Sequence, residues 1–129
     1  MSGEKRGRRP RGSPERIIYM NDYATPEAQR ATTRTYLRHF VRIHWSPSGR
    51  ARDDTFIEGQ MIDLIEFNGL WEIVLARYIP GGKDEHGNDR DWRYSGHYYN
   101  IPLHSVVAIR LWHPHSPPHG FQGRRPPGF

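Results

Sequence analysis

The dipeptide Asn68-Gly69 interrupts a predominantly apolar segment that extends over residues 56–79. This pair is the preferred connection of a two-residue β-hairpin, because a type I′ turn requires positive φ at both central positions. A long antiparallel hairpin is therefore predicted at the centre of the fold. Pairing outward from the turn predicts Leu64 opposite Ile73 and Ile62 opposite Leu75 on one face, and Ile65 opposite Glu72 and Asp63 opposite Val74 on the other.

A helix over residues 55–67 is the competing interpretation of the first half of this segment. Thr55 and Glu58 have the spacing of a capping box, and Gly69 suits the position that follows a helix. Gly59 would weaken such a helix in its interior. We favour the strand.

The residues before the hairpin predict a helix and then a strand. Thr25, Pro26 and Glu27 read as an N-cap, a proline at the first helical position and an acid in the first turn, so a helix of two or three turns is expected to start there. Alternation of apolar and polar residues over 36–45 predicts a half-buried strand.

The residues after the hairpin predict further strands. Aromatic residues at 92–101 and β-branched residues at 106–112 favour strands, joined by a tight turn at 102–105. The expected fold is mainly β with one short N-terminal helix (α+β), either a small five-stranded antiparallel sheet or a partly open barrel. In the order of its elements, over about residues 25–112, the chain resembles the small Sm-like and SH3-like barrels, which implies an architecture and no activity.

Charge divides the 129 residues into three parts, with net charges of +8 over residues 1–52, −6 over 53–109 and +3 over 110–129. Residues 1–16 are rich in Arg, Gly and Pro, so they predict a disordered basic arm. Residues 113–129, with five prolines, predict an extended Pro-rich tail. One small β-rich domain is expected over residues 17–112.

Seventeen of the nineteen basic residues are arginines, which suit bidentate contacts to phosphate and stacking on bases. Four of them recur every four residues, a spacing that places them on one face of either a helix or a strand. We therefore expect sequence-nonspecific binding of DNA or RNA. The candidate nucleic-acid-binding residues are Arg6, Arg8, Arg9, Arg11, Arg30, Arg34, Arg38, Arg42, Phe40 and His44.

A protein-interaction module, acting as an adaptor or inhibitor of a larger assembly, is the alternative hypothesis. Large aromatic residues are typical of protein interfaces, and an open sheet edge would allow a second copy to add. An acidic protein surface would suit the basic arm as a partner. The candidate interaction residues are Trp71, Trp92, Tyr94, Tyr98, Tyr99 and Trp112.

The chain has no cysteine, which excludes disulfides, thiolate metal sites and cysteine nucleophiles. The acidic loop at 84–91 matches no EF-hand spacing, and the Ser and His residues match no known catalytic motif. We expect no enzymatic activity, no cofactor and no dedicated metal site. No apolar stretch has the length of a membrane helix, so a cytoplasmic protein without membrane contact is expected.

Overall fold

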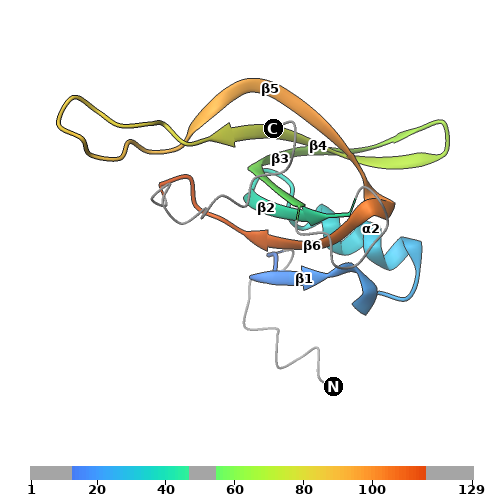
Figure 1. The fold of residues 1–129 in the computed structure, drawn as a ribbon. Coiled ribbons are helices and arrows are strands. Elements are labelled where there is room, and N and C mark those ends of the chain that lie inside the picture. The colour runs from blue at the N-terminus through green and yellow to red at the C-terminus, as the bar shows by residue number, and fades with distance from the viewer. Residues whose placement is uncertain (1–12, 47–54, 116–129) are drawn as a thin grey trace.

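The computed structural model describes residues 13–46 and 55–115, and these form a six-stranded antiparallel sheet with one α-helix (Figure 1). The prediction of a mainly β protein with one N-terminal helix is confirmed. The strand order is β1-β6-β2-β3-β4-β5. The elements are β1 (Ile17–Tyr19), η2 (Met20–Asp22), α2 (Pro26–Arg34), β2 (Phe40–Trp45), β3 (Thr55–Phe67), β4 (Leu70–Ile79), β5 (Arg93–Pro102), η3 (Leu103–Ser105) and β6 (Val106–Leu111).

Helix α2 starts where the sequence predicts it. Thr25 has extended backbone angles, and its side-chain oxygen accepts a hydrogen bond from the backbone N–H of Ala28 at 3.1 Å. Pro26 occupies the first turn, where a missing N–H costs nothing. The helix ends at Arg34, because the chain then tightens into successive turns at residues 35–38.

The strand predicted over residues 36–45 is wrong in its first part, because β2 begins only at Phe40. Tyr36 lies in the turn, is completely buried, and donates its hydroxyl hydrogen to the carbonyl oxygen of Glu15 at 2.6 Å. Arg38 adopts a φ of 71°, which no continuous strand accommodates. The local turn therefore overrides the alternation that the sequence suggests.

The central hairpin is confirmed, and residues 55–67 are strand rather than helix. Asn68 and Gly69 have φ values of 54° and 81°, as a type I′ turn requires. The predicted pairs of Leu64 with Ile73, Ile65 with Glu72 and Asp63 with Val74 are all present.

The fourth predicted pair, Ile62 with Leu75, is wrong because β3 is bulged between Met61 and Asp63. Met61 takes the place opposite Leu75 and is completely buried, whereas the side chain of Ile62 is 42 % exposed. A bulge adds one residue to its strand, so the alternation of side chains between the two faces shifts by one residue there. Met61 is therefore buried in the core where strict alternation predicts Ile62.

The sheet has six strands where five were expected, because residues 17–19 pair with β6 as an additional outer strand, β1. Strand β6 consequently lies between β1 and β2 and is not an edge. Strand β5 pairs with β4 alone in the described part of the chain, and a register shift opposite Ala76 and Tyr78 interrupts its ladder. In Figure 1 the β3–β4 turn and the loop between β4 and β5 project from opposite ends of the sheet.

The sheet buries apolar side chains on both faces. The larger core contains Val41 and Ile43 of β2, Leu75 of β4 and Ile109 of β6, all completely buried. A smaller cluster on the opposite face is built on Phe56 and Trp92, with Tyr78 and Trp112 packed against them. No helix among residues 13–46 and 55–115 is long and apolar enough to cross a membrane.

Candidate functional site

The four periodic arginines lie on three different elements and share no single face. Arg30 and Arg34 belong to α2, Arg38 lies in the turn that follows, and Arg42 belongs to β2. The expected stripe is not formed, because the helix ends between the second and third arginine. The arm residues Arg6, Arg8, Arg9 and Arg11 lie outside the described residues.

Arg30 and Arg34 instead gather around one aromatic side chain, Trp71 of β4. Their guanidinium carbons lie 5.0 and 5.3 Å from the centroid of the Trp71 ring. Cations at this distance from an indole ring are attracted by its π electrons, with about 0.5–1 kcal/mol for each exposed contact. The contact therefore joins the helix to the end of the central hairpin.

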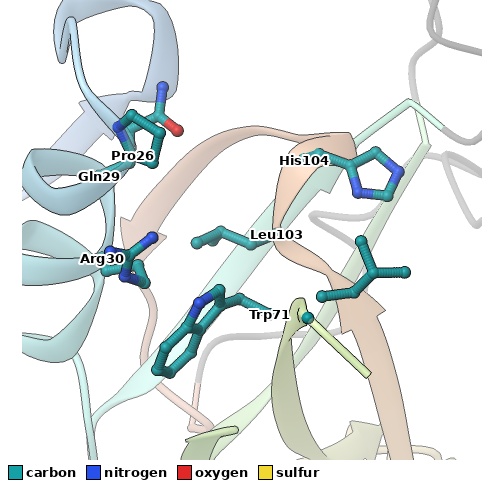
Figure 2. Close-up of a pocket in the computed structure, with 8 residues that line it drawn as sticks. Pro26, Gln29, Arg30, Trp71, Leu103 and His104 are labelled. Atoms are coloured by element: carbon teal, nitrogen blue, oxygen red, sulfur yellow. The ribbon is translucent and has the colours of Figure 1, made fainter. Parts of the chain in front are cut away.

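A pocket of about 310 Å³ opens beside this contact, between α2, the β3–β4 turn and η3. Figure 2 shows Pro26, Gln29 and Arg30 on the helix side and His104 on the opposite side, with Leu103 in the middle above Trp71. We call this the Trp71 pocket. Its lining residues are Pro26, Gln29, Arg30, Gly69, Leu70, Trp71, Leu103 and His104.

Hydrogen bonds hold the walls of the Trp71 pocket in place. The amide nitrogen of Gln29 donates to the backbone oxygens of Met20 and Tyr23 at 3.3 and 3.1 Å, which ties the helix to the segment before it. The hydroxyl of Ser105 donates to the carbonyl oxygen of Pro102 at 2.7 Å, which closes the turn that carries the buried Leu103. A partner would therefore meet a preformed cavity.

Two large apolar side chains project from the hairpin next to this pocket. Phe67 and Leu70 lie opposite each other on β3 and β4, and they are 64 % and 56 % exposed. We call this pair the hairpin tip. Leu70 also lines the Trp71 pocket, so the tip and the pocket form one continuous surface.

An aromatic cluster occupies the sheet face that bears Phe56. Its ring centroids are separated by 4.9 Å between Trp92 and Trp112, 6.1 Å between Tyr78 and Tyr94, and 5.9 Å between Tyr94 and Tyr98. Exposure increases along this series, from 5 % for Trp92 to 61 % for Tyr98 on the edge strand β5. Among the described residues, the cluster is most exposed at its β5 end.

The six predicted interaction residues thus occupy four environments. Trp71 lines its pocket, and Trp92 and Trp112 pack within the aromatic cluster. Tyr94 and Tyr98 are exposed on β5. Tyr99 packs against the larger core, beneath the guanidinium of Arg77 at 5.7 Å from its ring centroid.

The remaining nucleic-acid candidates share the face of β2 opposite the larger core. Phe40 packs edge-to-face on Tyr78 with centroids 5.1 Å apart. The Nε of Arg42 lies 3.0 Å from a carboxylate oxygen of Glu58, which is only 2 % exposed. His44 follows on the same face, and burial, Arg110 and Arg42, in that order, lower its pKa from 6.5 to about 4.

The low pKa of His44 predicts a loss of stability in acid. Between pH 6.5 and 4 the unfolded chain binds a proton at this ring that the folded chain does not, so the free energy of unfolding falls as the pH falls. We expect about 1 kcal/mol from this half-buried ring after allowance for solvent screening. Urea unfolding of the wild type and of His44→Gln at pH 7 and 5 measures it. The variant should lose less stability than the wild type on acidification, and equal losses would contradict the assignment.

Other polar clusters have local structural roles. The Asp84 carboxylate accepts hydrogen bonds from the backbone N–H groups of His86 and Asn88 at 2.8 and 2.9 Å, which shapes the loop between β4 and β5. Within the described ranges, no three His, Asp or Glu side chains are grouped closely enough to hold a metal ion.

Comparison with protein-family models, with curated proteins and with solved structures finds no match for this chain. Functional inference therefore rests on its own residues and their arrangement.

Proposed function

We propose that this chain is a protein-interaction module that holds its partner at the Trp71 pocket and the hairpin tip. The continuity of a preformed pocket with two exposed apolar side chains supports this proposal most directly. Adjacent exposed apolar side chains that continue into a pocket are typical of protein interaction sites. Tryptophan and arginine are also the residues most enriched where binding energy concentrates.

The lining of the pocket indicates the chemistry of the partner. Leu70, Leu103 and the Trp71 ring favour an apolar side chain inside the pocket. Arg30 and Arg34 add positive charge at its edge. Among the described residues, one carboxylate lies within ion-pair distance of these two arginines, that of Glu27 at 3.9 Å from Arg30. An apolar side chain flanked by a carboxylate would match both features. This corresponds to an acidic protein surface.

Replacing the two side chains of the hairpin tip is expected to abolish tight binding while leaving the fold intact. Phe67→Ser/Leu70→Ser removes exposed apolar area only, so affinity for the partner should fall about 10- to 100-fold with little change in unfolding temperature. Titration calorimetry with the partner measures the affinity, and sedimentation measures it where the partner is a second copy. Leu111→Ser, which removes a similarly apolar side chain from β6, serves as the control. Equal effects of the two changes would contradict the proposal.

Nucleic-acid binding is a second proposal, supported by the basic residues of the arm and by Arg110, which is exposed beside Arg42. The order of elements, which resembles that of the Sm-like and SH3-like barrels, is compatible with either binding role and selects neither.

Truncation of the arm is expected to weaken nucleic-acid binding and its dependence on salt. The truncated chain should start at Ser13, because residues 15 and 16 are hydrogen-bonded to the folded domain. The Tyr36 hydroxyl donates to the carbonyl oxygen of Glu15, and the backbone N–H of Leu111 donates to the carbonyl oxygen of Arg16. Loss of five basic residues should flatten the plot of log affinity against log salt by about four. Binding of single-stranded and double-stranded DNA and RNA at two salt concentrations measures the slope. An unchanged slope would exclude a role for the arm.

A further inference from the structure

We infer that the outer face of β1, β6 and β2 carries a phosphate-binding site for a nucleotide, free or within a single strand, whose base stacks on Tyr19. This inference does not depend on the protein-interaction proposal, because no residue of the Trp71 pocket lies on these three strands. A pocket of about 220 Å³ defines the site. Its lining residues are Ile17, Tyr19, His44, Val107, Ala108 and Arg110.

The site brings two cations together on neighbouring strands. Arg42 of β2 and Arg110 of β6 are directly opposite each other in the antiparallel register. The pKa of His44 responds to both guanidinium groups, and to Arg110 more than to Arg42. An anion bound at Arg110 would therefore meet a positive field that Arg110 dominates.

Arg110 is the cation available to a ligand. Arg42 is engaged by the Glu58 carboxylate at 3.0 Å and lies over the Phe56 ring, so its charge is largely offset. Arg110 is exposed, and the structure shows no carboxylate of the described residues within ion-pair distance of it. A guanidinium group binds phosphate in a bidentate manner with favourable geometry.

The environment of His44 is consistent with this positive field. The charged groups that act on its ring are Arg110 on β6 and Arg42 on its own strand. The ring of Phe56 on β3 lies 5.7 Å from it, centroid to centroid, and Tyr19 on β1 lines the same pocket. Burial followed by the two arginines lowers the pKa of His44 to about 4, so the ring is neutral at pH 7 and can donate or accept one hydrogen bond to a ligand.

Tyr19 supplies the surface for a base. Its side chain is 51 % exposed at the edge of the pocket, and it lies on the outermost strand. Every base presents a π face to such a ring, so stacking gives affinity without sequence preference. Phosphate on Arg110 and a base on Tyr19 together define a nucleotide.

Titration of the full chain followed by the NMR signals of the His44 ring tests the inference. The ligands are inorganic phosphate, adenosine, adenosine monophosphate and an eight-residue oligothymidylate. The monophosphate or the oligonucleotide should bind at least 10-fold more tightly than phosphate or adenosine, and the bound phosphate should raise the pKa of His44 from about 4 toward 6.5. Binding of the monophosphate would show that a free nucleotide is a sufficient ligand. Binding of the oligonucleotide alone would show that the ligand is a nucleotide within a single strand of nucleic acid.

Three variants separate this site from general attraction to positive charge. Arg110→Gln should weaken binding at least 10-fold, and Tyr19→Leu should weaken binding of the nucleotide but not of phosphate. Arg93→Gln, which removes an exposed arginine from β5, should leave both unchanged. The inference is overturned if no ligand perturbs the His44 ring, or if Arg93→Gln has the same effect as Arg110→Gln.

Discussion

Replacing Gly59 with alanine is expected to remove most of the stability of the domain. A Cβ atom at this position of β3 would lie 2.1 Å from the carbonyl oxygen of Ala76 and 2.9 Å from its carbonyl carbon. Both atoms belong to the backbone of β4, so the two strands would have to separate. We expect a loss of about 3–5 kcal/mol, at the upper end of the effects of single substitutions. Urea unfolding monitored by tryptophan fluorescence measures it.

Gly87→Ala provides the matched control for this substitution. Gly87 has a φ of 80°, and a Cβ there would meet no atom within 4 Å. Its replacement introduces backbone strain without a steric clash, which costs about 1 kcal/mol. Similar losses for the two variants would mean that close approach of β3 and β4 does not determine the need for glycine at position 59.

Replacing Glu58 with glutamine is expected to have the second largest effect. Glu58 is 2 % exposed, and its carboxylate lies 3.0 Å from the Nε of Arg42, whose side chain is 21 % exposed. Removing the negative charge leaves the guanidinium in a poorly hydrated place without this counter-ion. Breaking a buried pair in this way costs about 3 kcal/mol, which chemical denaturation of the variant measures.

The double variant Arg42→Met/Glu58→Leu tests whether the loss comes from the charge. Replacing both members of a buried pair with apolar residues is often neutral, so most of the stability should return. A double-mutant cycle with the two single variants gives the coupling energy directly. A double variant as unstable as the sum of the single variants would show that the two side chains act independently.

Local signals in the sequence were sufficient for the hairpin and the helix. The conformation of Asn68-Gly69 depends on two residues, and the cap at Thr25 depends on contacts within one turn, so short-range rules predicted both. The bulge at Ile62 was not predictable in this way. Alternation alone does not show where a strand gains a residue, and burial of Met61 against the larger core decides it.

The candidate site was predicted less well because its residues are distant in the sequence. Arg30 and Arg34 meet Trp71 only because α2 packs against the end of the hairpin. The four-residue spacing of the arginines places them on one face of either a helix or a strand. It therefore predicts one continuous stripe over residues 30–42, whereas the structure divides these arginines between α2, a turn and β2. A helix of two or three turns from Thr25 contains Arg30 and Arg34 and ends before Arg42, so its length is the sequence signal that separates these arginines.

The short strand β1 and the phosphate-binding site that we infer show the same limitation. Ile17, Ile18 and Tyr19 are a short run of apolar and aromatic residues, and their pairing with β6 depends on residues more than eighty positions later in the chain. That pairing brings Tyr19 beside Arg110 and His44. Composition therefore indicated the arginines and aromatic residues, whereas only the sheet topology brought them together.

Site-specific photo-cross-linking from position 70 tests the protein-interaction proposal most directly. A cross-linking amino acid in place of Leu70 is compared with one at Glu85, an exposed position in the loop at the opposite end of the sheet. The reaction is run with the purified chain alone and in an extract of the cells that produce it.

We predict one adduct of defined mass from position 70 and none from position 85. It should be lost when Arg30 and Arg34 are both replaced by serine, and its mass should show whether the partner is a second copy or another protein. The same adducts from both positions, or an adduct from position 70 that persists without the two arginines, would contradict a binding site at the Trp71 pocket and the hairpin tip.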